Sequence, residues 1–468
     1  MAPTQGLSDR LYASFESKVL ARQARRKRGS RRSDGSRSSP SWLASADRLG
    51  VRSAKALEPE AGDQCDHATS LRMDIHDWFE SVSGKGWLWF VKRLSGNDTL
   101  LNGSHQAGAY LPKPAAFRLF PSVRDGATNP RAQFAASIDS HDTQALPRLI
   151  WYNSKSRDEC RMTGWGGGKS PILDPDATGA TCVFAFEQES LERDAAVCCI
   201  WLCSTIDEEA AVDDRVGVVE PGNGVLYDAS GPLAQPFTSL ADRSCVLATA
   251  EMSPDWLIQF PTAEELVSLS VGRVPGATGR IPDERLLKRR DCEFSLFRSI
   301  EDFAVKPRIN EGFATVDLFV DFANSVTNRR KARSGLSFEL QLSRVFAEEG
   351  LPHSRGEISE GNKRPDFIFP SAEAYRDSAF DPLKLRVLGA KTTCKDRWRQ
   401  VLNEADRVPT KYLVTLQEGI TTAQFTEMED EGVTLVVPKS LHLSYPQQLR
   451  PRLLSLRDFI RQTRAACV

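Results

Sequence analysis

The sequence predicts a multidomain protein in which a mainly β domain precedes an α/β domain. The length of 468 residues suits two or three domains. Between residues 73 and 235, short apolar runs alternate with turn residues, a pattern typical of strands in a barrel or sandwich. From residue 335 onward, apolar runs of strand length alternate with segments of helical periodicity, which is typical of an α/β fold.

The first 72 residues are basic and serine-rich, and the stretch 22–41 has few apolar residues. This composition predicts disorder, because too little apolar surface can be buried. The segment is either a nonspecific DNA-binding arm or a solvated extension upstream of the first domain. We favour the extension, because the segment beginning at Met73 makes a natural domain start.

The predicted domains are an extension at 1–72, a β domain at 73–235, a linker at 236–250 and an α/β domain at 251–468. Strands of the β domain are expected at 87–94, 115–123, 148–154, 181–187 and 195–203. The glycine-rich stretch 164–170 is expected to be a turn. It is not a phosphate-binding loop, since Thr163 stands where that motif requires glycine.

Composition excludes several classes of protein. The ten cysteines form no paired CxxC motif, and Cys198, Cys199 and Cys203 lie in an apolar run that predicts buried thiols. We therefore expect a reduced, cytoplasmic protein without zinc. No apolar run is long enough to cross a membrane. The formal net charge of −1 means that any affinity for DNA must come from local basic patches.

The first expected element of the α/β domain is a helix, which Ser334 or Ser337 would cap and Gly350 would end. The expected elements are helix 335–349, strands 365–369 and 385–391, helix 395–406, strand 412–416, helix 422–430, strand 433–437 and helix 453–463.

The region before this domain, 251–333, is expected to be partly helical, with Thr262 and Glu265 forming a capping box. It should pack on the α/β domain and carry part of a dimer contact. A basic run faces either DNA phosphates or solvent, and its members are Arg329, Arg330, Lys331 and Arg333.

A pair of polar residues on adjacent predicted strands points to chemistry on phosphodiesters. Asp366 opens one strand, and Lys391 closes the next. Mg²⁺ is commonly held by one or two carboxylates together with phosphate oxygens and water. It polarises the phosphoryl group and lowers the pKa of a bound water, while a nearby lysine offsets developing charge. The pair therefore indicates a magnesium-dependent nuclease site.

The sequence segments around this pair strengthen the assignment. EGNKRPDFIFPSAEAY, AKTTCKDRWRQVLNEAD and LQEGITTAQFTEMEDEGVTLVVPKSLH resemble the catalytic domain of the EcoRII restriction endonuclease family, with its PD-(D/E)xK nuclease core. Gly389 departs from the motif, which has an acid there. One variant of the family supplies that acid about thirteen residues past the lysine, and Glu404 stands at this position. The resemblance implies that Asp366 and Glu404 hold Mg²⁺.

Two further residues are candidates for this site. Glu339 is either an extra acid that supports the metal or its water, or an exposed surface acid. Tyr375 matches a tyrosine implicated at the family's active site, although a packing tyrosine is the alternative.

The β domain also resembles the EcoRII family, through KRLSGNDTLLNGSHQAGAYLPK and YNSKSRDECRMTGWG. The resemblance implies a B3-like pseudobarrel that binds DNA through two arms. Arginine can bond guanine, and glutamate can accept from cytosine. A solvated strand face would explain the alternating charges equally well. The implied DNA contacts are His105, Tyr110, Lys155, Arg157, Glu159 and Arg161.

In the α/β domain, the residues that read bases are expected to be Lys395, Asp396 and Arg397. Related enzymes carry a similar charged cluster at the start of the helix after the catalytic lysine, where it faces the major groove. A helix cap with flanking charges is the alternative, and both roles are compatible.

Together these features imply a type II restriction endonuclease of the IIE kind, acting on double-stranded DNA at a CCWGG-like site. The β domain would bind a second copy of the site as an effector and block cleavage until it does. A palindromic site implies a homodimer, and self-protection implies a companion cytosine methyltransferase. The alternative is a non-catalytic, sequence-specific DNA-binding regulator built on the same domains.

Overall fold

A computed structural model describes residues 73–468, with short gaps. The gaps are 104–107, 125–127, 155–157, 223, 230–234, 237–244, 277–280, 396, 409 and 468. The predicted extension at 1–72 and most of the predicted linker lie outside the described residues. Residues from Ile75 onward form one compact unit. Below, the N-terminal domain means the described residues from 75 to 236, and the C-terminal domain those from 245 to 467.

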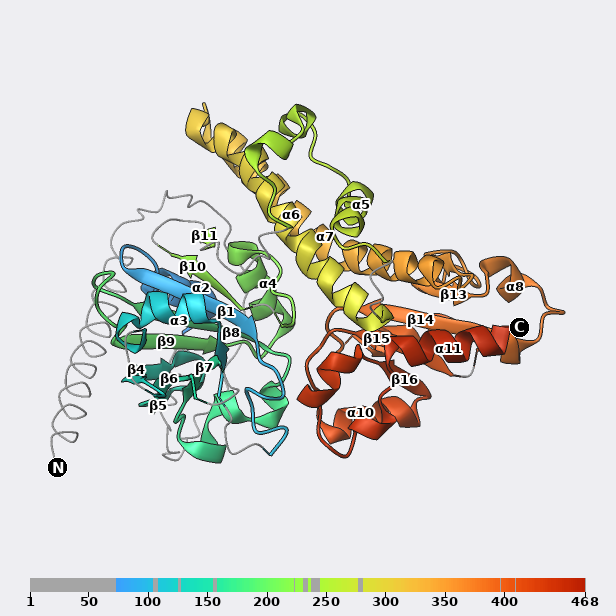
Figure 1. Ribbon diagram of the computed structural model, residues 1–468, viewed down its shortest axis with the longest axis horizontal. Helices are drawn as coiled ribbons and strands as arrows, with labels where there is room; N and C mark the ends of the chain where they lie inside the picture. Colours follow the sequence, from blue (N-terminus) through green and yellow to red (C-terminus); the bar gives the residue numbers. More distant parts are fainter. Residues whose placement is uncertain are drawn as a thin grey trace, which may run out of the picture. The chain divides into compact units, whose positions relative to one another are not determined.

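The N-terminal domain contains two sheets (Figure 1). The first has the strand order β11 (Gln235–Pro236), β10 (Val225–Asp228), β1 (Trp87–Arg93), β8 (Thr181–Glu187), β9 (Val197–Leu202), β4 (Ala135–Ile138) and β5 (Thr143–Ala145). The second has the order β2 (Tyr110–Leu111), β7 (Glu159–Thr163), β6 (Arg148–Tyr152) and β3 (Arg131–Gln133). All pairs are antiparallel except β4 with β9. A mainly β domain is confirmed.

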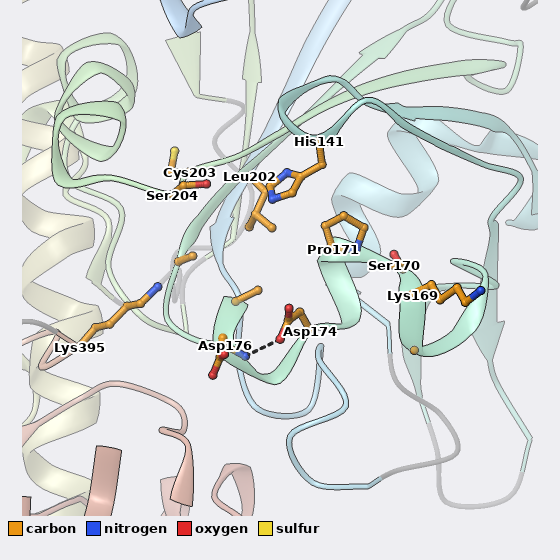
Figure 2. Close-up of a pocket in the computed structure, with 13 residues that line it drawn as sticks. His141, Lys169, Ser170, Pro171, Asp174, Asp176, Leu202, Cys203, Ser204 and Lys395 are labelled. Atoms are coloured by element: carbon orange, nitrogen blue, oxygen red, sulfur yellow. Dashed lines mark hydrogen bonds between the residues drawn. The ribbon is translucent and has the colours of Figure 1, made fainter. Parts of the chain in front are cut away.

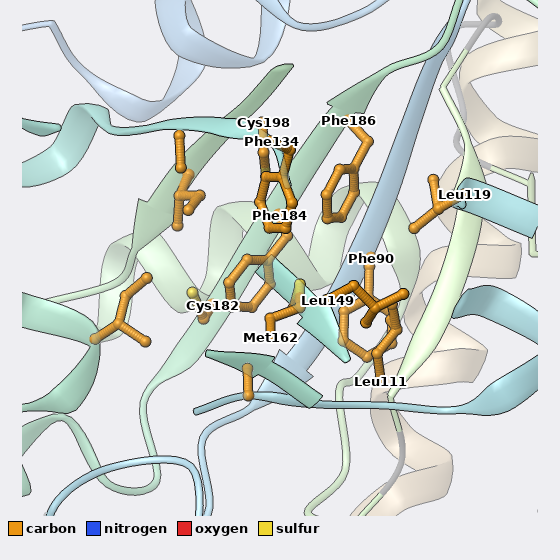
Figure 3. Close-up of a cluster of buried hydrophobic side chains, with 14 of the residues drawn as sticks. Phe90, Leu111, Leu119, Phe134, Leu149, Met162, Cys182, Phe184, Phe186 and Cys198 are labelled. Carbon is orange, nitrogen blue, oxygen red and sulfur yellow. The ribbon is translucent and has the colours of Figure 1, made fainter. Parts of the chain in front are cut away.

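Strands β1, β8 and β9 have β-branched and aromatic residues on both faces, so both faces are covered by other elements. One face carries an aromatic cluster (Figure 3) in which the ring centroids of Phe134 and Phe186 lie 5.6 Å apart. The cluster also contains Phe90, Phe120 and Phe184, all fully buried. Buried aromatic area of this kind stabilises the domain and holds its loops in place.

One predicted strand of this domain is wrong. Residues 115–123 form helix α3 (Lys113–Leu119) and a 3₁₀ turn (Pro121–Val123). A proline stands in the first helical turn, where its fixed φ is favourable. Ala115, Ala116 and Leu119 are buried on one helical face. Two other helices border the sheets, α2 (Ile75–Ser81) and α4 (Ile206–Val216).

The C-terminal domain is built on a mixed five-stranded sheet (Figure 1), as its alternating pattern predicts. Its order is β12 (Ser354–Arg355), β13 (Phe367–Phe369), β14 (Arg386–Lys391), β15 (Lys411–Thr415) and β16 (Val433–Val436). Strands β14, β15 and β16 are parallel, and the other pairs are antiparallel. The remaining elements of this part are α8 (Ala372–Arg376), α9 (Arg399–Leu402), α10 (Thr422–Asp430) and α11 (Leu456–Cys467).

Three helices of the C-terminal domain precede its sheet in the chain: α5 (Ala263–Arg273), α6 (Pro282–Glu311) and α7 (Val316–Glu348). The capping box of Thr262 and Glu265 at the start of α5 is confirmed. Helix α7 begins at a Thr315 cap, well before the predicted 335–349 helix, so the predicted caps Ser334 and Ser337 lie inside it. Ser337 instead donates to Glu293 on α6.

The basic run near the middle of α7 does not present a row of free charges to DNA. Each side chain has an acidic or aromatic neighbour within the protein, because α7 packs against α6 and the N-terminal domain. The pairs are Arg329 with Phe260, Arg330 with Glu301, Lys331 with Asp214, and Arg333 with Glu220 and Glu293.

The cysteines depart from the fully reduced expectation at one place. Cys245 and Cys292 form a disulfide that joins the segment before α5 to helix α6. As predicted, Cys198, Cys199 and Cys203 are buried thiols. Within the described residues, no helix is both long and apolar enough to span a membrane.

Candidate active site and DNA-binding surfaces

Asp366 and Lys391 meet at one end of the antiparallel pair β13 and β14. The Lys391 ammonium lies 2.9 Å from Asp366 Oδ2, which also accepts a 2.6 Å hydrogen bond from the Ala390 amide. Both side chains are mostly buried, at 19% and 13% exposure. The apolar residues of β13 and β14 bury both strands, so this charged pair is held at the ends of two inner strands of the sheet.

Two further carboxylates, those of Glu404 and Glu339, interact electrostatically with Asp366 and Lys391. Burial and the nearby Asp366 carboxylate raise the pKa of Glu404 to about 7, although Lys391 acts in the opposite direction. The same two causes raise the pKa of Glu339, with Arg355 and Lys391 opposing them. Mutual repulsion of this kind requires the carboxylates to be close together. The structure thus brings together four predicted residues from α7, β13, β14 and the segment after α9.

Steric packing explains why glycine stands at position 389, where the family motif has an acid. A Cβ atom on Gly389 would lie 2.5 Å from Val401 Cγ2. Val401 is fully buried in the cluster beneath β15, so it has little room to move. An acid at 389 would therefore clash with this packing, and Glu404 supplies a carboxylate from elsewhere.

Glu404 does not lie on a long helix as predicted. Helix α9 spans only Arg399–Leu402, and Glu404 follows it. The reason lies in the packing, because Trp398 and Val401 belong to one buried cluster whereas Ala405 belongs to another. A single helical stripe cannot face both clusters, so the chain turns between them. The Glu404 carbonyl accepts from Ser359 at 2.8 Å, which fixes that turn.

The site suits a divalent cation with few protein ligands. Glu404 Oε2 is buried and has no hydrogen-bond partner within the protein, and its carboxylate is repelled by Asp366. A cation between these carboxylates would relieve both penalties. Among the described residues, no group of three or more His, Cys, Asp or Glu side chains is arranged to hold a metal ion. Two carboxylates with water and phosphate oxygens are a typical arrangement for Mg²⁺.

Tyr375 lies in a different environment from the acids. It is 1% exposed and packs in the cluster that includes Ala405 and Val408. Its hydroxyl accepts from the Arg407 amide at 3.3 Å, and burial raises its pKa to about 12. These contacts are those of a packing tyrosine that buttresses the segment after Glu404.

The two described base-reading candidates differ in their exposure to solvent. Arg397 is exposed, while Lys395 is half-buried. The Arg397 amide donates to the Cys394 carbonyl at 3.1 Å, which closes a tight turn before α9. Asp396 lies outside the described residues. Below, the reading loop means the described residues 394, 395 and 397.

In the N-terminal domain, sheet register gathers three of the predicted DNA contacts. Tyr110 on β2 pairs with Arg161 on β7. The Arg161 guanidinium lies 3.3 Å from the Glu159 carboxylate. The other three predicted contacts, His105, Lys155 and Arg157, lie outside the described residues.

A buried ion pair beneath these residues escaped sequence reasoning. Asp98 is fully buried and lies 2.6 Å from Lys92, and it accepts the Tyr110 amide at 2.8 Å. Burial alone would raise the pKa of Asp98, but the Lys92 ammonium and backbone donors outweigh it and lower that pKa. Nothing in the sequence around Asp98 distinguishes it from a turn residue, because its partners lie on other strands.

The N-terminal domain contacts the C-terminal domain through the segment that begins at Gly96. The Gly96 amide donates to the Glu418 carbonyl at 2.6 Å. The Asn102 amide group donates to the Ser444 carbonyl at 3.1 Å. A pocket of about 200 Å³ at this contact is lined by Tyr110 and Arg161 as well as by Glu418 and Ser444. Residues predicted to bind DNA therefore border the contact between domains.

A second pocket lies beside the reading loop (Figure 2). It measures about 330 Å³, and all its lining residues except Lys395 come from the N-terminal domain. The Lys395 side chain points into this pocket, whose lining also includes Asp174 and Asp176 (Figure 2). One predicted base-reading side chain thus faces the other domain.

A buried ionic cluster secures a third contact between the domains. Glu220, which follows α4, lies 2.7 Å from Arg290 on α6 and 2.6 Å from Arg333 on α7. Burial would raise the pKa of Glu220, but the two guanidinium groups lower it to about 2. The pairing was not predictable from the sequence, because the three residues are distant in the chain and look like surface charges.

Two family models match the chain. One, described as restriction endonuclease EcoRII, N-terminal, matches residues 83–230, and the other, EcoRII C terminal, matches residues 297–460. Among individual relatives, the type II restriction enzyme EcoRII of Escherichia coli is 41% identical over 395 residues, covering 82% of this chain and 96% of the relative. The type II restriction enzyme SsoII of Shigella sonnei is 25% identical over 150 residues, covering 30% of this chain and 48% of the relative.

Solved structures give weaker similarities. A metal-depleted Ecl18kI in complex with uncleaved, modified DNA aligns with a TM-score of 0.38 and 20% identity, covering 44% of this chain and 79% of that chain. A UbaLAI restriction endonuclease B3 domain with cognate DNA aligns with a TM-score of 0.23 and 18% identity, covering 33% of this chain and 89% of that one.

Proposed function

The chain belongs to the EcoRII family of type II restriction endonucleases, and from this premise we propose that it cleaves double-stranded DNA at a CCWGG-like site in a magnesium-dependent reaction. The observation that carries the proposal is the convergence of Asp366, Lys391, Glu404 and Glu339 at one end of strands β13 and β14. The proposed domains are those predicted above, with a B3-like effector domain before residue 236 and a catalytic domain after residue 250.

Asp366 and Glu404 would hold Mg²⁺ between them. When bound, the cation would polarise the phosphodiester and lower the pKa of a water molecule. Lys391, held against Asp366 at 2.9 Å, is placed to stabilise charge on the phosphoryl oxygens. Glu339, tethered by Arg355 at 3.6 Å, would orient the attacking water. Arg397 and Lys395 would read bases, and Tyr375 would support the segment that carries Glu404.

We propose that the N-terminal domain binds a second copy of the site, through Tyr110, Glu159 and Arg161 and through His105, Lys155 and Arg157 outside the described residues. It would inhibit cleavage while docked on the C-terminal domain. Two contacts support this regulation. Gly96 and Asn102 bond to the C-terminal domain beside Tyr110 and Arg161, and Lys395 faces the N-terminal domain. Effector DNA and the C-terminal domain would therefore compete for one surface of the N-terminal domain.

A homodimer is proposed because a two-fold symmetric enzyme suits a nearly palindromic site. The end of α6 and the start of α7 support it, since large apolar side chains there are exposed to solvent. These residues are Ile309, Val316, Leu318, Phe319 and Val320. A companion cytosine methyltransferase would protect the host's own sites.

The experiment that tests this function is cleavage of a plasmid carrying several CCTGG sites, with Mg²⁺ and with excess chelator. We expect discrete fragments only with Mg²⁺, and none from a matched plasmid in which every site carries one changed base pair. Specific binding without cleavage, under all metal conditions, would instead support a non-catalytic regulator.

A further inference from the structure

Gln417, which follows strand β15, is a buried amide with partners on both of its ends. It is 1% exposed. Its Oε1 accepts the backbone amides of Cys394 at 3.0 Å and Lys395 at 3.1 Å. Its Nε2 donates to the Gly419 carbonyl at 2.9 Å, and its own carbonyl accepts from the Tyr445 hydroxyl at 2.7 Å. The side chain is therefore held rigidly on the end of a central strand.

The two amides that Gln417 accepts belong to the first two residues of the reading loop. The described residues of this loop belong to neither a strand nor a helix, because β14 ends at Lys391 and α9 begins at Arg399. Cys394 is fully buried, so its amide has no access to water if Gln417 is removed. The loop would then have to shift to satisfy that donor, and the side chains that follow would shift with it.

We propose that Gln417 is a positioning residue for sequence recognition, which holds the reading loop in the geometry that lets Lys395 and Arg397 meet base edges. The inference rests on the proposed function, since it assumes that this loop reads bases. Gln417 itself is buried, and its hydrogen bonds described above are with none of the acids of the active site. Bidentate contacts to bases depend on precise placement of the donors, so a displaced loop loses discrimination between sequences.

The substitution that tests the role is Gln417→Met in the full-length protein. Methionine has nearly the same length and fills the same space, but it cannot accept the two amides. The matched control is Gln424→Met on α10. Gln424 accepts the Thr421 amide at 3.3 Å in a helix cap of the same domain, so its loss affects stability without touching the reading loop.

The readout is the ratio of kcat/KM on DNA with two CCTGG sites to that on the same DNA with one base pair changed in each. We expect Gln417→Met to lower this ratio at least tenfold and Gln424→Met to leave it within twofold of wild type. An equal loss of rate on both DNAs would mean a merely structural role and would overturn the inference. So would an unchanged ratio.

Gln417 also lies against the N-terminal domain, because a Cβ on Gly179 would be 2.8 Å from its Nε2. A variant could thus act by loosening the docked domain. Gly96→Ala is the control for that effect, since Gly96 contacts the C-terminal domain at Glu418 and Ser444 and not at the loop. We expect Gly96→Ala to lower the ratio clearly less than Gln417→Met does, because undocking relieves inhibition on both DNAs but leaves the reading loop in place. A ratio that falls equally in Gly96→Ala and Gln417→Met would overturn the proposed role.

If Gln417→Met does not fold, a second variant, Gln417→Glu, tests the same role. In Gln417→Glu the carboxylate can still accept both amides, although it cannot donate to Gly419. We expect it to retain most of the wild-type ratio, and loss of discrimination there would contradict the assignment. A wild-type enzyme that cuts both DNAs equally would overturn the proposed function itself, whereas a discriminating wild type matched by Gln417→Met overturns only this inference.

Discussion

The backbone amide of Gly96 donates a 2.6 Å hydrogen bond to the carbonyl of Glu418, and this bond joins the two domains. The approach is so close that a Cβ on Gly96 would lie 2.0 Å from the Ser444 carbonyl oxygen. Glycine is therefore required here for docking and not for an unusual backbone angle, since its φ is not in the left-handed region. Adding one methyl group at position 96 should therefore separate the two domains.

We predict that Gly96→Ala raises the cleavage rate on DNA with a single site. The added methyl group cannot coexist with the Ser444 carbonyl, so the docked arrangement loses stability and the reading loop is uncovered. The assay is cleavage of a one-site plasmid by wild type and variant at equal concentration. Gly168→Ala is the control, since a Cβ there meets only Leu100 at 3.9 Å. If Gly96→Ala is slower than wild type, docking promotes cleavage and the inhibition model fails.

Asp366→Asn should abolish cleavage while preserving specific binding. The amide keeps the shape of the side chain but removes the charge that pairs with Lys391 and that would hold Mg²⁺. Cleavage of a multi-site plasmid and binding to a CCTGG duplex are measured on the same preparation. Asp430→Asn, exposed at the end of α10, is the control and should cut normally. Wild-type cleavage by Asp366→Asn would place the metal elsewhere.

Glu404→Gln should lose most of the activity, and an acid at position 389 should not restore it. A side chain on Gly389 would collide with Val401, so Glu404→Gln with Gly389→Asp remains inactive. Adding Val401→Ala makes room for the new carboxylate, at a cost of roughly 1–3 kcal/mol in stability for the lost packing. Partial recovery only in the triple variant is the expected pattern. Full activity in Glu404→Gln alone would assign the second ligand to Glu339.

The C-terminal domain was largely predictable because its signals are local. Strand β14 and helix α10 match the expected apolar runs within one residue, since each run alone buries a strand or a helical face. The position of Glu404 relative to Lys391 could be taken from the family resemblance. The short α9 could not be predicted, because its end depends on two separate buried clusters brought together by the fold.

The contacts between domains were not predictable for a similar reason. Arg333 reads as a member of a basic surface run, and only the fold shows that Glu220 and Glu293 neutralise it. Gln417 has no local signal either, because its partners come from a loop earlier in the chain. Residue types that serve a non-local partner look like ordinary surface residues in a single sequence.

Arg397→Ala is predicted to weaken binding to the cognate site by about 1–3 kcal/mol, the usual value of a bidentate contact to guanine. Arg397 is exposed and its side chain stabilises no buried cluster, so the folding temperature should hardly change. Binding is measured on a CCTGG duplex and on an unrelated duplex of the same length. Equal weakening on both duplexes would assign Arg397 to phosphate contact instead of base reading.

The last prediction concerns acid sensitivity at Glu220. Its pKa is about 2 in the folded protein, against an ordinary value of 4.5. Because the folded pKa is the lower one, the ionised form stabilises the fold above pH 4.5, and this contribution is lost as the pH falls toward 2. Glu220→Gln removes the charge and leaves Arg290 and Arg333 buried without it, which should cost about 3–5 kcal/mol near neutral pH.

The measurement is the free energy of unfolding in urea for wild type and Glu220→Gln from pH 7 down to pH 3. The difference between them should be constant above about pH 4.5 and shrink below it, since protonated glutamic acid resembles glutamine. Glu311→Gln is the control, because its carboxylate is 70% exposed on the surface of α6. A difference that stays constant down to pH 3 would mean that Glu220 stabilises the contact by shape and not by charge.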